Sequence, residues 1–89
     1  MKVLSDKNLI CKAERKFPDF IVEYQLFESE KVFDIKALKF PNKESSHVFE
    51  ESTVLNFEWR KKEAILIFEK IVRCSVTPMC LEDAISELI

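Results

Sequence analysis

The residues of this chain that are best suited to catalysis are one histidine, two nearby acids and three cysteines. His47 precedes Glu50 and Glu51, and the thiols belong to Cys11, Cys74 and Cys80. An imidazole can take the proton of a cysteine thiol, which leaves a strongly nucleophilic thiolate. Such a site also requires donors for the developing oxyanion, commonly backbone N–H groups of a sharp turn. These residue types therefore raise the possibility of nucleophilic catalysis by a cysteine, with His47 as the base.

The chain supplies no glycine-rich turn for such donors, because it contains no glycine in 89 residues. At the usual content of about 7%, roughly six glycines would be expected. Walker-type phosphate loops, dinucleotide fingerprints and nucleophile elbows all need glycine where the backbone takes positive φ or approaches a ligand. We therefore predict that the protein is not an enzyme, and we assign it no catalytic or cofactor-binding residue and no cofactor. We also expect that no position in the chain requires a glycine.

The cysteines are odd in number and lack the C-x-x-C spacing of redox and zinc motifs. A tetrahedral zinc site needs four donors, and His47 is the only histidine. We predict no metal site and no disulfide. The three thiols are expected to be reduced and mostly buried.

Size and charge narrow the class of protein further. A chain of 89 residues builds one hydrophobic core, so residues 1–89 are predicted to be a single domain. Fourteen basic and sixteen acidic side chains leave a net charge of −2, which provides no global attraction to nucleic acid or to an anionic membrane. The sequence shows neither a signal peptide nor a membrane-spanning run, which predicts a cytoplasmic protein without a membrane partner.

Two segments rich in β-branched and aromatic residues, 20–27 and 32–40, predict a β-hairpin. With Phe27 opposite Val32, one face of the hairpin is wholly apolar. It pairs Leu26 with Phe33, Tyr24 with Ile35, and Val22 with Ala37. A two-residue turn on Ser29 and Glu30 would need positive φ, so we expect a four-residue loop, 28–31, around a type I turn.

The segments on either side of the hairpin are less distinct. Residues 9–15 alternate, with Leu9, Cys11 and Ala13 on one side, which indicates a first strand. A helix capped by Asp6 is the alternative for residues 7–16. Residues 41–46 are polar and predict a loop, followed by a short fourth strand at 47–51.

The C-terminal third is predicted to be helical. Asn56 is a plausible N-cap for a helix over 57–73, whose apolar side begins at Trp59 and ends at Val72. A second helix is indicated by Thr77 as N-cap and Pro78 at the first helical position.

Within that second helix, Val76 before the cap and Leu81 at the fourth helical position form a hydrophobic staple. The elements together predict an α+β fold, with a three- or four-stranded antiparallel β-meander followed by two C-terminal helices packed on one face.

The last fifth of the chain resembles the ending of a family of small Firmicutes proteins of unknown function, V-T-P-x-x-L-x-D-V-x-E-D-x-L. The positions that match are Val76, Thr77, Pro78, Leu81 and Asp83. The order of the preceding elements is also similar. The resemblance supports the predicted fold and implies no activity, because the family has none assigned.

If both helices cover one face of the sheet, four large apolar side chains are left on the other. They are Ile21, Phe27, Val32 and Leu38. Such a face favours a small protein-binding or regulatory module that contacts another protein or forms a homodimer. The alternative is a nucleic-acid-binding regulator that uses the basic helix 57–73. Its candidate contacts are Arg60, Lys61, Lys62, Lys70 and Arg73.

Overall fold

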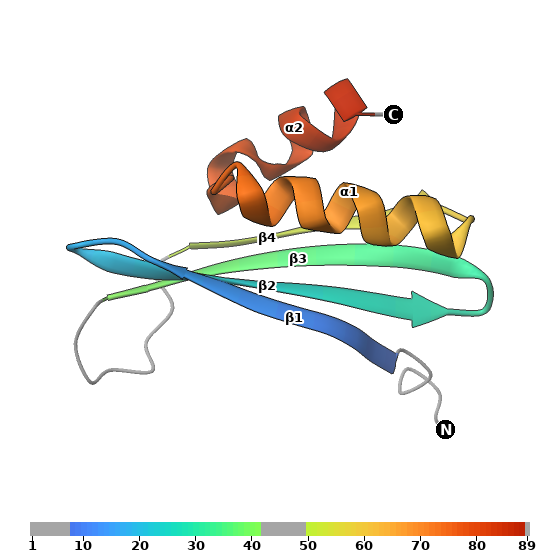
Figure 1. Cartoon of the computed structure of the whole chain (residues 1–89), viewed down its shortest axis with the longest axis horizontal. Helices are drawn as coiled ribbons and strands as arrows, with labels where there is room; N and C mark the ends of the chain where they lie inside the picture. The colour runs from blue at the N-terminus through green and yellow to red at the C-terminus, as the bar shows by residue number, and fades with distance from the viewer. Residues whose placement is uncertain (1–7, 42–49, 89) are drawn as a thin grey trace.

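The computed structural model describes residues 8–41 and 50–88. Four antiparallel strands form one sheet in chain order: β1 (Asn8–Lys16), β2 (Phe20–Ser29), β3 (Val32–Pro41) and β4 (Glu50–Glu58). The helix α1 (Lys61–Arg73), the 3-10 turn η2 (Pro78–Cys80) and the helix α2 (Leu81–Leu88) follow. Both helices lie on the same side of the sheet (Figure 1). The predicted α+β meander with two C-terminal helices is confirmed, with four strands.

The core lies between the inner face of the sheet and the two helices. The two central strands contribute six buried residues: Val22, Tyr24, Leu26, Phe33, Ile35 and Ala37. The helices contribute Ala64, Ile67, Phe68, Ile71, Leu81 and Ile85. The six strand residues are those that alternation placed on the apolar face, because successive side chains of a strand point to opposite sides.

The register of the hairpin differs from the prediction by two residues. Phe27 pairs with Asp34 instead of Val32, and Val32 pairs with Ser29. A shift of two residues leaves every side chain on its predicted face, since the side-chain period is also two. The apolar pattern is therefore equally compatible with both registers, and the geometry of the turn decides between them.

The turn itself has two central residues, Glu30 and Lys31, with φ of 47° and 73°. Positive φ at both positions defines a type I′ turn, whose twist matches that of the flanking strands. The predicted four-residue loop is wrong because this match in twist prevails even without glycine. Asn56 and Ser75 also have positive φ, 52° and 54°. Four described positions therefore take the left-handed backbone that favours glycine, and other residues occupy all four of them.

We expect the double substitution Glu30→Asn and Lys31→Gly to raise the free energy of unfolding by about 1–2 kcal/mol. Left-handed backbone is costly for a residue with an ordinary side chain, and Asn-Gly is the preferred pair in this turn. Urea denaturation measures the change. Glu28→Gly, inside β2, is the matched control and should destabilise, because glycine is unfavourable within a strand. A double variant less stable than the wild type would contradict the expectation.

The first segment is a strand, as the alternation indicated, and it contains a bulge. Leu9 pairs with Phe27 while Cys11 pairs with Leu26, so Ile10 is the extra residue. An extra residue reverses the facing of what precedes it. Ile10 and Cys11 pack against the core, whereas Leu9, predicted on the same side as Cys11, is 49% exposed.

The fourth strand is longer than predicted, and the helix after it begins later. The predicted strand 47–51 shares only Glu50 and Glu51 with β4, and 47–49 lie outside the described residues. The helix predicted over 57–73 begins at Lys61. Asn56 is no N-cap: it lies in an irregular stretch of β4, between Val54, paired with Ile35, and Glu58, paired with Phe33.

The link between the helices reverses the chain without glycine. Ser75 N donates to Val72 O at 3.0 Å and Val76 N to Ile71 O at 3.2 Å, the two hydrogen bonds of a Schellman motif. Ser75 takes the left-handed position that glycine usually fills. The predicted start at Thr77 and Pro78 is observed, but the first turn is η2 and α2 begins at Leu81. Neither described helix has the length and apolarity to cross a membrane.

Candidate protein-binding face

The outer face of the sheet is the side away from the helices (Figure 1). Its centre is polar and internally paired. Lys12 Nζ lies 3.6 Å from Glu23 Oε2, and Lys36 Nζ lies 3.9 Å from Glu51 Oε2. Gln25 Nε2 also donates to Glu23 Oε2 at 2.6 Å. We call these five residues the polar band. It contains residues of all four strands and lies between the apolar side chains near the two ends of the face.

Apolar side chains gather on the outer face near the hairpin turn. We define the turn-end patch as Leu9, Phe27, Val32 and Leu55. Leu9 pairs with Phe27 across β1 and β2, and Val32 lies diagonally from Phe27 on β3. Leu55 follows Val54, the partner of Ile35. Leu9 is 49% exposed and Leu55 58%, and Phe27 and Val32 are partly exposed. The patch presents its largest exposed area on the two edge strands.

The predicted quartet is therefore not one continuous patch on the outer face. Phe27 and Val32 belong to the turn-end patch, whereas Ile21 lies beyond the polar band, where it pairs with Phe40. Leu38 lies within the band, between its partners Glu23 and Glu51. Leu38 is only 9% exposed and offers little contact surface.

Leu9 did not appear in the sequence-based interface because a bulge follows it, and Leu55 did not because it lies beyond the predicted strand 47–51. Alternation counted across a bulge assigns the wrong face. The available signal for Leu55 was its position two residues after Thr53, in a β-branched run.

A hollow of about 190 Å³ adjoins the patch, lined by Phe27, Asp34, Lys36 and Thr53. Asp34 is 2% exposed, and its Oδ1 accepts a hydrogen bond of 2.7 Å from the backbone N–H of Asn56. A carboxylate that accepts this bond helps to hold the irregular part of β4 in its left-handed turn. Asp34 thereby positions Leu55, the next residue toward the N-terminus.

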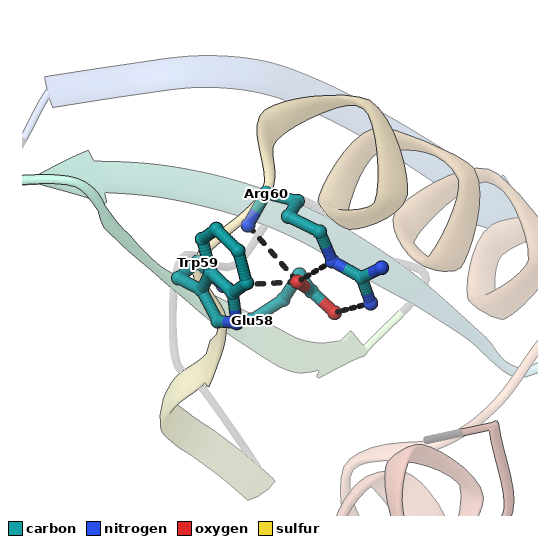
Figure 2. Close-up of polar contacts among 3 residues, drawn as sticks. All are labelled: Glu58, Trp59 and Arg60. Atoms are coloured by element: carbon teal, nitrogen blue, oxygen red, sulfur yellow. Dashed lines mark hydrogen bonds and ion pairs between the residues drawn. The ribbon is translucent and has the colours of Figure 1, made fainter.

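The junction between β4 and α1 is organised by Glu58 (Figure 2). Its Oε2 accepts hydrogen bonds from the backbone N–H groups of Trp59 at 3.1 Å and Arg60 at 2.9 Å, and from Arg60 Nε at 2.9 Å. Arg60 Nη2 donates to Oε1 at 3.3 Å. The hydrogen bond from the Arg60 side chain is the main cause that lowers the pKa of Glu58 to about 2. The carboxylate therefore replaces the predicted Asn56 as the side chain that organises the start of the helix.

Glu58→Gln is expected to lower the stability of the protein near neutral pH and to have less effect in acid. The pKa of Glu58 is lowered from 4.5 to about 2, so its contribution is complete above the unfolded value and is lost as pH falls through that interval. The difference in unfolding free energy between wild type and variant should shrink between pH 4.5 and pH 2. Urea denaturation at several pH values tests this. Glu69→Gln, at an exposed position of α1, is the control. A difference independent of pH would be the contrary result.

Trp59 was expected on the apolar side of a helix, but it precedes α1 and is 70% exposed. The Arg60 guanidinium carbon lies 5.5 Å from the centre of its ring. The indole therefore projects from the corner next to the buried Glu58 carboxylate, at the end of β4.

The five basic residues of the alternative nucleic-acid interface do not form one free strip. Arg60 precedes α1 and is held by Glu58, which raises its pKa above the ordinary value. Lys61 and Lys62 are in the first turn of α1, and Lys70 and Arg73 are in its last turn. Glu69 lies between these two pairs in sequence, so the positive charge is concentrated at the two ends of the helix.

The groups considered for nucleophilic chemistry are not brought together in the described part of the chain. His47 lies outside it. Cys74 and Cys80 are exposed and Cys11 is partly buried, with all three thiols free. The expectation of mostly buried thiols is therefore wrong, because Cys74 ends α1 and Cys80 faces outward from η2. No cluster of three or more metal-binding side chains occurs within residues 8–41 and 50–88.

No protein-family model matches the chain, and no curated protein or solved structure matches it. The resemblance of the C-terminal segment to a Firmicutes family therefore stays a prediction.

Proposed function

We propose that this protein is a small, non-enzymatic binding module that contacts another protein, or a second copy of itself, through the outer face of its sheet. The turn-end patch is the observation that carries the proposal. Leu9, Phe27, Val32 and Leu55 bring apolar surface from all four strands to one region. Grouped apolar side chains are favourable anchors when a partner removes them from water.

The polar band supports a specific contact rather than a general hydrophobic one. Its charges are paired within the face, at 3.6 Å for Lys12 and Glu23 and 3.9 Å for Lys36 and Glu51. A partner must therefore match apolar surface at the ends and tolerate neutralised charge in the middle. We place this activity in the cytoplasm, where the three unpaired thiols would stay reduced.

Two substitutions to aspartate compare the outer face with the helical layer. Phe27→Asp places a charge in the turn-end patch, and Leu66→Asp places the same charge on α1, where Leu66 is 58% exposed. We expect a partner that binds wild type and Leu66→Asp equally to bind Phe27→Asp roughly 30-fold or more weakly, as for a central anchor. The partner is captured on the immobilised wild-type protein and purified. Titration then gives its dissociation constant for the wild type and for each variant.

Circular dichroism establishes that both variants are folded. Emission from Trp59, the only tryptophan, provides a second readout of binding. Equal loss of binding in the two variants, or no loss in Phe27→Asp, would remove the outer face from consideration. If the captured partner is released by salt and binds to α1, the result would support the alternative function, binding of nucleic acid.

A further inference from the structure

The outward edge of β1 is open to another strand. In the described part of the chain, β1 pairs with β2 along one side and with no strand along the other. An open edge presents unpaired backbone N–H and C=O groups, which a further strand can satisfy. From Cys11 to Lys16 the pairing with β2 is regular, so this part of the edge is extended and suited to pairing.

A charge on this edge is unfavourably placed within the single chain. Glu14 is exposed and lies directly opposite Glu23. Like charges at directly opposed positions destabilise a strand pair. Glu23 is joined to Lys12 at 3.6 Å, and no ion pair engages Glu14 among the described residues. A positive group approaching from the open edge would relieve it.

The spacing of charge along β1 selects one antiparallel register with a second copy. Lys12 and Glu14 are both on the outer face, on either side of Ala13. A two-fold axis at Ala13 sets Lys12 of each copy opposite Glu14 of the other. An axis at Lys12 would oppose two lysines, and an axis at Glu14 would oppose two glutamates. An axis at Arg15 would pair Glu14 with Lys16 but would oppose two arginines on the other face. The register centred on Ala13 makes both outer-face charge pairs attractive and opposes no like charges, because opposed strand residues must share a face.

The helical side of the same edge agrees with this axis. A groove of about 280 Å³ lies between β1 and α1, lined by Ala13, Arg15, Phe68, Glu69, Val72 and Arg73. The small side chain of Ala13 permits close approach at the axis. A second copy in this register places its own groove beside the first and covers apolar surface from Val72, which is partly exposed.

We propose that the partner of the β1 edge is β1 of a second copy, paired antiparallel about Ala13, so that two four-stranded sheets become continuous. The contact uses the edge of the sheet and leaves the turn-end patch free. It is a second surface, distinct from the outer-face contact of the proposed function, and its test is independent of capture through Phe27.

Charge exchange at two positions tests both the dimer and its register. Light scattering after size exclusion, over a concentration series to high micromolar, should give the wild type a mass twice the 10.5 kDa of the chain. Glu14→Lys opposes two lysines across the axis and should weaken the dimer on the order of tenfold or more. Lys12→Glu opposes two glutamates and should do the same. The combined variant Lys12→Glu with Glu14→Lys restores opposite charges and should recover the dimer.

Glu14→Lys separates loss of the dimer from loss of the fold. In the single chain it places a lysine opposite Glu23, which is an attractive pair. The monomeric variant should therefore stay folded, and the substitution should not lower its thermal unfolding temperature. A wild type that remains monomeric at high micromolar concentration would overturn the proposal. So would a Glu14→Lys dimer as tight as the wild type, or a combined variant that stays monomeric. Phe27→Asp should leave the dimer mass unchanged.

Discussion

Leu81→Ala is expected to lower the free energy of unfolding by about 2–5 kcal/mol, the cost of removing a buried leucine and leaving a cavity. Leu81 begins α2 and is 0% exposed within the core. An isolated helix of eight residues is not stable in water, because helices shorter than about 12–15 residues are marginal even with favourable sequences. Most of the stability of α2 therefore depends on burial of this side chain and of Ile85.

Met79 provides the matched control for Leu81. It lies in η2, two residues before Leu81, and is 78% exposed. Met79→Ala should change stability by less than about 0.5 kcal/mol, as surface substitutions usually do. Thermal unfolding followed by circular dichroism measures both variants, with a shift of about 4–8 °C for each kcal/mol in a domain of this size. Similar shifts for the two variants would show that α2 is not held by Leu81.

Tyr24→Phe is expected to cost about 1–3 kcal/mol, although it removes only one oxygen atom. Tyr24 lies in the centre of the inner face, is 0% exposed, and donates a hydrogen bond from its hydroxyl to Val76 O at 2.8 Å. This bond joins β2 to the link between the two helices. In the variant, the carbonyl of Val76 loses its partner. Urea denaturation near neutral pH gives the difference.

Alkaline pH provides an independent test of the same hydroxyl. Burial raises the pKa of Tyr24 to about 12 from an ordinary 10, with the Arg15 charge acting in the opposite direction. The unfolded chain releases the tyrosine proton first, so this contribution to stability is present below pH 10 and is lost as pH rises from 10 to 12. The difference between wild type and Tyr24→Phe should shrink over that interval.

Tyr24 is the only tyrosine, so ultraviolet absorbance of tyrosinate reports its ionisation without overlap from another residue. Titration of the folded protein should be displaced to higher pH than titration in urea. Coincident curves, or a Tyr24→Phe variant as stable as the wild type, would contradict the role assigned to the hydroxyl.

The turn-end patch is only half predictable from the sequence. Phe27 and Val32 were found from alternation, and they do lie together on the outer face. Leu9 was missed because the bulge at Ile10 changes its facing, and Leu55 was missed because β4 extends beyond the predicted strand 47–51. The bulge and the length of β4 both depend on pairing between strands, which no single segment specifies.

The sequence by itself determined the order of the elements and which strand side chains face the core. Period-two alternation placed Val22, Tyr24 and Leu26 inside, and Thr77 with Pro78 marked the start of the last helical segment. These features are local. Each depends only on the alternation of side chains along one strand or on the residues that begin one helical segment.

Only the tertiary structure decided the register of the hairpin, the start of α1 and the positions that take left-handed backbone. A shift of two residues preserves every facing, so the choice belonged to the type I′ turn at Glu30 and Lys31. Likewise α1 begins where Glu58 can accept from Trp59 and Arg60. The absence of glycine does not remove left-handed turns from this fold. Sheet twist and hydrogen bonding hold ordinary residues there, because each such position is determined by the elements on both sides of it.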